Sequence, residues 1–248
     1  MRIAILSDIH SNLPALEAVL EDVEGVDPEQ FWCLGDVVGY GAQPVECTTL
    51  VRERCDLSLV GNHDLAVLGN LDLATFSPAA AAAVEWTQEC SSPETLDFLR
   101  ELEPADTTHE VALYHASPRD PVWEYVLWPE QAAECMAEQA ARVSLIGHSH
   151  VALFFVATEA AEKGRLEARG AQAGAGTDLD LREGTWLINP GSVGQPRDGD
   201  PRASWLELDT ESWNATYHRV EYEIDRAAAA IERTELPGAL ARRLYVGQ

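Results

Sequence analysis

The sequence has few basic residues and almost no lysine. Its 17 Lys and Arg residues stand against 42 Asp and Glu residues, which gives a formal net charge of −25, and Lys163 is the single lysine. A surface of this charge repels phosphate backbones, so general nucleic-acid binding is disfavoured. A P-loop is excluded as well, because that motif needs a Gly-Lys step that the chain does not contain.

Paired cysteines and long hydrophobic runs are also missing. The five cysteines are odd in number and none are spaced as Cys-x-x-Cys, a pattern that is typical of reduced thiols. The apolar run at the N-terminus stops at Asp8, which is too short for a secretion signal, and no stretch approaches the ~18 apolar residues of a membrane helix. We therefore expect a cytoplasmic protein without a membrane partner.

The residues that are present favour a folded α/β protein. Hydrophobic residues make up 46% of the chain and charged residues 24%, as in globular proteins. At the start of the chain the apolar pattern predicts alternating strands and helices: a strand over 2–7, a helix over 13–24, a strand over 31–34, a helix over 44–54 and a strand over 57–60. This alternation predicts parallel strands joined by crossover helices.

The rest of the chain mixes both types of element. The pattern predicts helices over 77–89, 92–101 and 129–141 and from 225 onward, and strands over 111–114, 143–146, 153–157, 186–188, 204–208 and 216–220. Residues 158–184 are rich in Ala, Gly and charge, and we expect them to form a mobile hairpin or loop. Because strands resume beyond this segment, we expect a single domain over residues 1–248.

Five of the seven histidines follow apolar strand runs: His10, His63, His115, His148 and His150. The carboxyl ends of parallel strands gather at one edge of a sheet, so these side chains are expected to meet there, together with nearby acidic residues. Imidazole and oxygen ligands without cysteine suit Mn, Fe, Ni or Zn, and their number exceeds the needs of one ion. Two ions require a shared carboxylate, for which Asp36, preceded by a small glycine, is the candidate.

The order of these motifs is similar to that of a known family. The series Asp-x-His, Gly-Asp, Gly-Asn-His-Asp, His and Gly-His-x-His, between residues 8 and 150, resembles the calcineurin-like metallophosphoesterases. Residues 189–198 resemble the small bacterial and archaeal phosphodiesterase branch of that family. The resemblance implies an α/β fold of two mixed β-sheets packed as a sandwich and flanked by helices, in four layers. It also implies two divalent or transition metal ions, Mn, Fe, Ni or Zn, at the loop edge of the sheets.

The resemblance further implies a role for each residue of the motifs. It assigns two groups of metal ligands that share one carboxylate: Asp8, His10 and His150 for one ion, Asn62, His115 and His148 for the other, and Asp36 for both. It makes His63 a catalytic residue beside the metals, with Asp64 as its orienting partner. The chain departs from the branch at Ala116, where glycine is usual.

The chemistry that fits these residues is phosphoester hydrolysis. Two dications lower the pKa of a bridging water, so that a hydroxide attacks phosphorus in line at neutral pH. The same ions neutralise charge on the phosphoryl oxygens, and His63 can give a proton to the leaving group. We therefore expect hydrolysis of a small substrate, either a phosphodiester or a phosphomonoester.

Other residues are candidates for substrate binding. Arg119 and Arg197 could each bind a phosphate oxygen or form a surface salt bridge, and Tyr40 could line the mouth of the site or pack against a turn. Three aromatic residues could stack on a base or aryl leaving group, although a role in the core is favoured: Trp123, Tyr125 and Trp128.

Three other functions are weighed against this one. A dinucleoside polyphosphate hydrolase ranks second, because cleaving such a chain should need several cations around the site and this sequence has few. A non-catalytic interaction scaffold on the same fold is disfavoured because His63 and all seven ligand positions are present. A repair-type DNA nuclease is disfavoured because it would need a basic channel.

Overall fold

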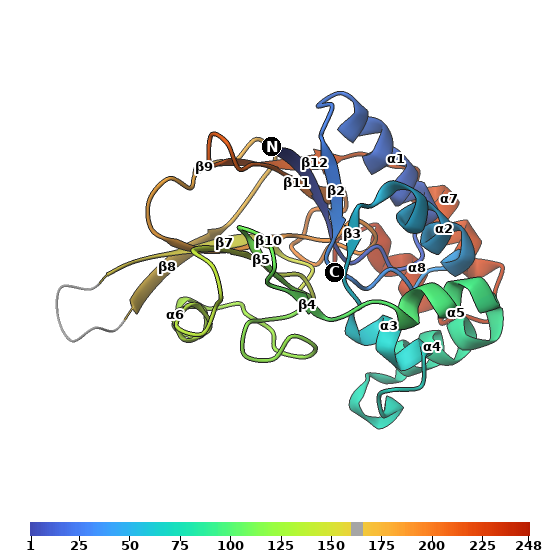
Figure 1. Ribbon diagram of the computed structural model, residues 1–248. Coiled ribbons are helices and arrows are strands. Elements are labelled where there is room, and N and C mark those ends of the chain that lie inside the picture. The colour runs from blue at the N-terminus through green and yellow to red at the C-terminus, as the bar shows by residue number, and fades with distance from the viewer. Residues whose placement is uncertain (160–165) are drawn as a thin grey trace.

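The computed structural model describes residues 1–159 and 166–248, which form two mixed six-stranded sheets with helices on the outside (Figure 1). In order across the first sheet, the strands are β3 (Leu57–Ser58), β2 (Gln30–Cys33), β1 (Arg2–Leu6), β11 (Ala203–Asp209), β12 (Asn214–Val220) and β9 (Asp178–Asp180). Strands β1, β2 and β3 are parallel, and β11 joins β1 in the antiparallel sense. The parallel pairing expected at the start of the chain is therefore present.

The second sheet is also mixed. Its strands, in order, are β4 (Ala105–Asp106), β5 (Ala112–Tyr114), β6 (Val143–Leu145), β10 (Thr185–Pro190), β7 (Ala152–Glu159) and β8 (Leu166–Gln172). Strands β5, β6 and β10 run parallel, whereas β7 pairs antiparallel with both β10 and β8. Strands β8 and β9 fall within the segment 158–184, where we predicted a mobile hairpin or loop. Residues 160–165 of that segment lie outside the described residues.

Strand β1 shows why the sheets stack. Successive side chains of a strand point to opposite faces, and in β1 both faces are buried. Ile3 and Ile5 pack between the two sheets with residues such as Trp32, whereas Ala4 and Leu6 pack under the helices of the first sheet. A strand buried on both faces has an uninterrupted apolar sequence, which is the pattern seen at the N-terminus.

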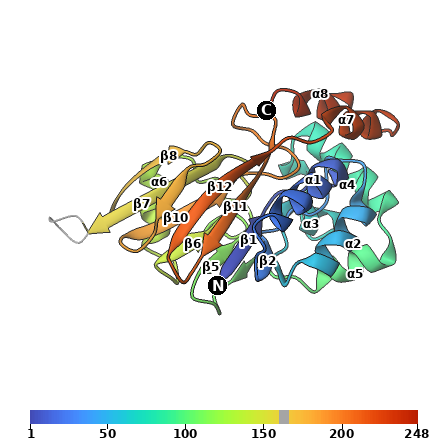
Figure 2. The same cartoon turned by 90° about the horizontal axis from the view of Figure 1, so that it is seen from above.

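The helices cover the outer faces of the sandwich and give it four layers (Figures 1 and 2). They are α1 (Leu13–Glu24), α2 (Pro44–Arg54), α3 (Asn62–Val67), α4 (Pro78–Cys90), α5 (Pro93–Arg100), α6 (Pro129–Met136), α7 (Ile224–Glu232) and α8 (Gly238–Leu244), and a short 3-10 helix spans Leu73–Thr75. Helix α6 packs on the second sheet through Ala132 and Met136. The α/β sandwich of two mixed sheets flanked by helices is confirmed.

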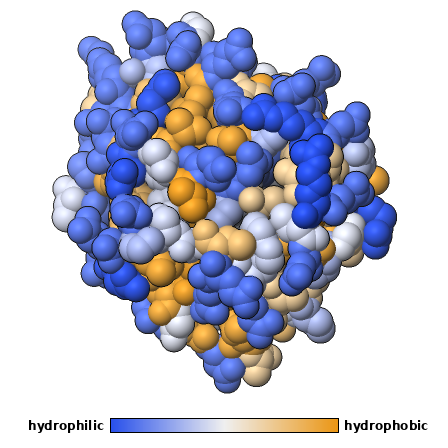
Figure 3. All heavy atoms as spheres, turned by 90° about the vertical axis from the view of Figure 1, so that its right-hand side faces the viewer, coloured by the Kyte–Doolittle hydropathy of each residue, from blue (hydrophilic) through white to orange (hydrophobic). Residues whose placement is uncertain are grey.

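Capping residues set the start of several helices as the sequence predicts. Asn12, Ser77 and Ser92 each accept a hydrogen bond from a backbone N–H in the first turn of α1, α4 and α5, and a proline follows within two residues. The face of the molecule that carries the helices is mostly hydrophilic, with its hydrophobic atoms in interrupted groups (Figure 3). No helix within the described residues has both the length and the apolar character to cross a membrane.

Candidate metal centre

The polar residues singled out by the sequence converge at one edge of the two sheets. Asp8 and His10 follow β1, Asp36 follows β2, His115 follows β5, and His148 follows β6. Four more of the predicted residues lie at the same edge: Asn62, His63 and Asp64 in the first turn of α3, and His150 after β6. All nine side chains are buried, none more than 3% exposed.

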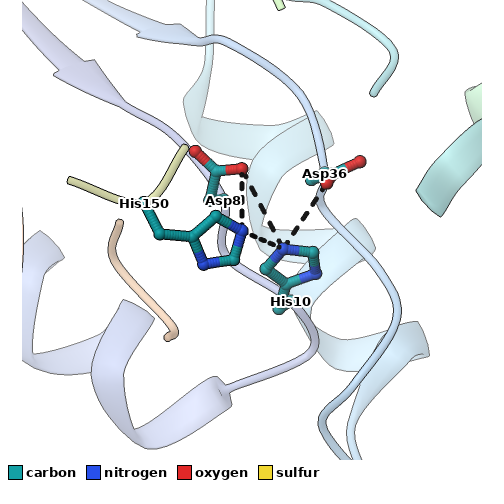
Figure 4. A group of neighbouring side chains, drawn as sticks. All are labelled: Asp8, His10, Asp36 and His150. Atoms are coloured by element: carbon teal, nitrogen blue, oxygen red, sulfur yellow. Dashed lines mark hydrogen bonds and ion pairs between the residues drawn. The ribbon is translucent and has the colours of Figure 1, made fainter. Parts of the chain in front are cut away.

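The first group of candidate ligands comprises Asp8, His10, Asp36 and His150 (Figure 4). One potential ligand atom from each lies within 4.8 Å of all the others. Nε2 of His150 lies 3.4 Å from Oδ1 of Asp8, and Nε2 of His10 lies 3.5 Å from Oδ2 of Asp36. Figure 4 shows the four side chains pointing toward one another, Asp8 and His10 from the loop after β1 and the other two from the loops after β2 and β6. This spacing can accommodate one cation.

A second group shares Asp36 with the first. Ligand atoms of Asp36, His115 and His148 again lie within 4.8 Å of one another. Nε2 of His115 is 3.7 Å from Oδ2 of Asp36 and 3.2 Å from Oδ1 of Asn62. The same oxygen of Asp36 therefore faces both His10 and His115, which is the geometry of a carboxylate between two cations.

Unpaired oxygens support a cationic occupant. Oδ1 of Asp8 and Oδ2 of Asp36 are buried and have no hydrogen-bond partner among the described residues, and such atoms are costly to bury unless a partner or a metal satisfies them. The other oxygen of each carboxylate is bonded: Oδ2 of Asp8 accepts from Ser7 at 2.7 Å, and Oδ1 of Asp36 accepts from the backbone N–H of His63 at 2.8 Å. Each carboxylate is thus fixed with one oxygen free.

Backbone carbonyls orient three of the histidines. Nδ1 of His10, His115 and His150 lies 3.0, 2.8 and 2.6 Å from the carbonyl oxygens of Val38, Leu34 and Gln195 respectively. Because a carbonyl oxygen only accepts, Nδ1 carries the proton and Nε2 faces the site as a lone pair, as metal-binding histidines do. His148 is reversed, since its Nε2 lies 3.2 Å from the carbonyl oxygen of Trp123.

Burial favours the neutral form of several side chains in this centre. It raises the pKa of Asp8 to about 7 and raises the pKa of Asp36 well above its usual value. It lowers the pKa of His10, His148 and His150 well below that of a free imidazole. Desolvation is the main cause in each case, because a low-dielectric interior penalises the charged form. Neutral imidazoles are the form that binds metals.

Backbone strain is concentrated in the same loops. Among the described residues nine non-glycine residues have positive φ, and seven of them lie in the loops of this centre: Asp8, His10, Ser11, Asp36, Tyr40, His148 and His150. Such left-handed conformations are unfavourable for residues with a Cβ. Gly61 serves a different purpose, because a Cβ there would lie 2.0 Å from Oδ1 of Asp36.

Asp64 does not contact His63 as expected. Its carboxylate accepts hydrogen bonds from three backbone N–H groups, those of Val37, Val38 and Gly61, at 2.9–3.2 Å. Nδ1 of His63 is buried without a hydrogen-bond partner among the described residues. The expectation of an orienting pair is therefore wrong, since these backbone donors occupy both oxygens of Asp64. Asp64 instead ties the loop after β2 to the start of α3.

Of the three candidates for substrate binding, two lie at the centre and one lies in surface ion pairs. Arg119 forms ion pairs with Glu124 and Glu134 and is therefore a surface salt-bridge residue. Arg197 and Tyr40 both lie at the centre, with Cζ of Arg197 5.5 Å from the centroid of the Tyr40 ring.

The aromatic residues after His115 do not all belong to the core. Tyr125 is 44% exposed and its ring centroid lies 4.1 Å from that of His148, so it borders the centre. Trp128 is 65% exposed, whereas Trp123 packs against Phe76 with a centroid distance of 5.0 Å.

Two residues of the 189–198 motif hold loops of the centre, a role that was not predicted. Nδ2 of Asn189 donates to the carbonyl oxygen of Gly147 at 2.6 Å and to Oγ of Ser149 at 3.0 Å. Oγ of Ser192 donates to the carbonyl oxygen of Asp8 at 2.7 Å. The motif itself was the signal in the sequence, but the residues that it contacts lie 40 or more positions away and could not be inferred from it.

Comparisons with known proteins concern the family and the fold of the chain. A model of the calcineurin-like phosphoesterase superfamily domain matches residues 1–212, so that α7 and α8 lie beyond the match. An uncharacterized protein of Methanocaldococcus jannaschii is 40% identical over 251 residues, covering 99% of this chain and 98% of that protein. The crystal structure of a metallophosphoesterase from Sphaerobacter thermophilus superposes with a TM-score of 0.88 at 39% identity and covers 100% of this chain and 99% of that one.

A more distant likeness concerns the fold alone. The crystal structure of a hypothetical protein from Pyrococcus horikoshii gives a TM-score of 0.78 at 20% identity, covering 100% of this chain and 98% of the other. The match over residues 1–212 and the high identity of full-length relatives establish descent as well as fold. The chain belongs to the calcineurin-like phosphoesterase superfamily.

Proposed function

We propose that the protein is a metal-dependent hydrolase that uses two divalent or transition metal ions to cleave a phosphodiester or a small phosphomonoester. The observation that carries this proposal is the position of Oδ2 of Asp36, which faces Nε2 of His10 at 3.5 Å and Nε2 of His115 at 3.7 Å. Sites with two metals and a shared carboxylate commonly serve phosphoester chemistry. The expectations of a single domain and a cytoplasmic location are part of the same proposal.

The ligand assignment follows the two groups of side chains. We assign Asp8, His10 and His150 to one ion, Asn62, His115 and His148 to the other, and Asp36 to both. Carboxylate, imidazole and amide donors without thiolate suit Mn, Fe, Ni or Zn. When bound, such ions supply a nucleophile at neutral pH and offset the charge on the phosphoryl oxygens.

His63 is the proposed proton donor to the leaving oxygen. Its ring lies 4.9 Å from that of His10 and 4.3 Å from that of Tyr40, centroid to centroid, so it borders the metal ligands. Its Nδ1 is buried without a hydrogen-bond partner among the described residues and lies close to Gly39, so Nε2 is the nitrogen that remains to reach a substrate. Burial lowers the pKa of His63, so the imidazole is neutral at rest and takes up a proton before it gives one to the leaving oxygen. The rings of Tyr40 and Phe76 pack on it and fix its direction.

The test is reconstitution of metal-stripped protein with Mn, Fe, Ni or Zn. Bis(4-nitrophenyl) phosphate and 4-nitrophenyl phosphate serve as diester and monoester substrates, and bound metal is measured after gel filtration. We expect about two ions per chain and turnover of at least one ester. A protein that binds no metal and cleaves neither ester under all four conditions would contradict the proposal and would favour a scaffold.

A further inference from the structure

Two arginine side chains meet over Tyr40, beside the candidate metal centre. Cζ of Arg197 lies 5.5 Å from the centroid of the Tyr40 ring, and Cζ of Arg243 lies 5.9 Å from it. The same ring lies 4.7 Å from that of His10 and 4.3 Å from that of His63, centroid to centroid. Both guanidinium groups therefore lie against a tyrosine ring that itself packs on the proposed catalytic histidine and on a proposed metal ligand.

Neither arginine has an aspartate or glutamate partner in the part of the chain that the structure describes, although Nε of Arg243 donates to the main-chain oxygen of Gln248. No ion pair there involves Arg197 or Arg243, although acidic residues outnumber basic ones by 42 to 17. Nε of Arg197 is buried without any hydrogen-bond partner among those residues. The other described arginines that form no ion pair are exposed: Arg52, Arg142, Arg169, Arg233 and Arg242. Partial burial without an acidic side chain as partner thus sets Arg197 and Arg243 apart.

The fold holds both side chains in place. Arg243 lies on α8, whose Leu240 and Leu244 pack with Tyr40 in one apolar cluster together with α7. The backbone N–H of Arg197 donates to the carbonyl oxygen of His150 at 3.0 Å, which ties it to a candidate metal ligand. Figure 2 shows α7 and α8 side by side near the C-terminus. Helix α8 therefore places the positive charge of Arg243 against the Tyr40 ring.

This arrangement is unfavourable in the absence of an anion. Burial and the nearby charge of Arg197 lower the pKa of Arg243, as expected where like charges approach each other. Two dications would add to the excess of positive charge, because the carboxylates of Asp8 and Asp36 offset only half of the formal charge of the ions. Ionisable groups whose pKa is perturbed in this way are typical of binding sites. A ligand with several negative charges would relieve the repulsion.

We propose that Arg197 and Arg243 form an anion subsite beside the metal centre, and that it binds a second phosphate group adjacent to the scissile one. This inference rests on the proposed function and specifies its substrate class: small molecules with at least two neighbouring phosphate groups. Guanidinium groups suit this role because their paired N–H donors match two phosphate oxygens. A phosphate that lies between two metal ions does not by itself need two further cations.

The experiment measures binding of methylphosphonate and methylenediphosphonate to metal-loaded protein by titration calorimetry. The variants are Arg243→Gln and, as the matched control, Arg242→Gln, which removes an exposed neighbouring charge on the same helix. We expect Arg243→Gln to weaken methylenediphosphonate by about tenfold and methylphosphonate by less than about twofold. Arg242→Gln should bind both ligands as the wild type does. Complexation of free metal by the ligands is common to all proteins and cancels in the comparison.

Two results would overturn the subsite. Equal losses for both ligands would mean that Arg243 serves the scissile phosphate, and unchanged binding of both would mean that it serves neither. Melting curves check that Arg243→Gln is folded. Hydrolysis of bis(4-nitrophenyl) phosphate separates the two proposals: if the wild type cleaves the diester but Arg243→Gln binds methylenediphosphonate normally, only the subsite fails. If the wild type neither cleaves the diester nor binds methylphosphonate, the proposed function itself fails.

Discussion

Nε2 of His10 and Nε2 of His150 lie 3.0 Å apart and cannot form a hydrogen bond with each other in their neutral forms. Each ring gives its proton to a backbone carbonyl through Nδ1, so two lone pairs face each other. Burial lowers the pKa of both rings and disfavours the extra proton that could join them. A shared metal ion would convert this repulsion into two bonds.

Metal should therefore stabilise the fold. A ligand at 100 times its dissociation constant adds about 2.7 kcal/mol to the free energy of unfolding, which raises Tm by about 5–10 °C for a chain of this length. We expect this shift when Mn²⁺ or Zn²⁺ is added to metal-stripped protein in a thermal melt. His10→Asn should lose most of the shift, whereas the exposed control His109→Asn should retain it. Equal Tm values with chelator and with metal would contradict the prediction.

Asp36→Asn should impair both metal positions at once. The change removes the negative charge from the oxygen that faces His10 and His115, so we expect a loss of bound metal and a fall in turnover of about 10²–10³-fold. Metal analysis and diester hydrolysis measure the two effects. Asp97→Asn, at an exposed ion pair with Arg100, is the control and should behave as wild type. Full metal content in Asp36→Asn would argue against a shared ligand.

His63→Ala should separate metal binding from catalysis. His63 lies beside the ligands but its side chain is assigned to neither ion, so the variant should keep its metal while kcat falls by about 10²–10⁴-fold. Metal content per chain and kcat for the diester are measured on the same sample. An unchanged kcat would remove His63 from the mechanism, and a loss of metal would make it a ligand.

Asp64→Ala should chiefly lower the free energy of unfolding, and not kcat. Three backbone N–H groups would lose their acceptor, at a cost of at least about 2 kcal/mol in the free energy of unfolding. Urea denaturation measures this change, and the surface variant Asp97→Ala provides the baseline. A variant with wild-type stability and greatly reduced kcat would restore the orienting role that the sequence suggested.

Asn189→Ala should loosen the loop that carries His148. The substitution frees the carbonyl oxygen of Gly147 and Oγ of Ser149, and loss of such supporting contacts typically lowers metal affinity by about 10–100-fold. Competition with a fluorescent chelator measures the affinity. The exposed control Asn70→Ala should be neutral, and equal affinities in the two variants would show that Asn189 does not position the loop.

Much of the fold could be predicted because local signals and burial agree. The apolar run of β1 is buried on both faces, and caps such as Ser77 and Ser92 start their helices where expected. Strand β4 was not foreseen, because two residues carry no periodic signal. The helix predicted over 129–141 ends at Met136, and Gln139 then donates its side-chain amide to the carbonyl oxygens of Ala141 and Arg142.

The candidate ligands could be predicted from their places after strands, whereas contacts between distant segments could not. Asp64 follows His63 in sequence, yet its partners include Val37 and Val38, which the loop after β2 brings to it. Arg243 carries no motif, and only the packing of α8 against Tyr40 reveals where its charge lies. The low number of basic residues led us to expect few cations around the site. Composition alone does not show where those residues lie in the fold.

Asp8, Asp36 and His150 have positive φ angles, so the free-energy cost of shaping the site arises during folding and not during metal binding. Each such conformation is disfavoured by about 1 kcal/mol or more, and folding supplies that energy through the rest of the sandwich. An arriving ion then meets loops whose conformational entropy has already been lost. Preorganisation of this kind predicts rapid metal uptake with little chain rearrangement. It also makes the positive-φ positions that are not assigned as ligands, such as Ser11 and Tyr40, intolerant of β-branched residues.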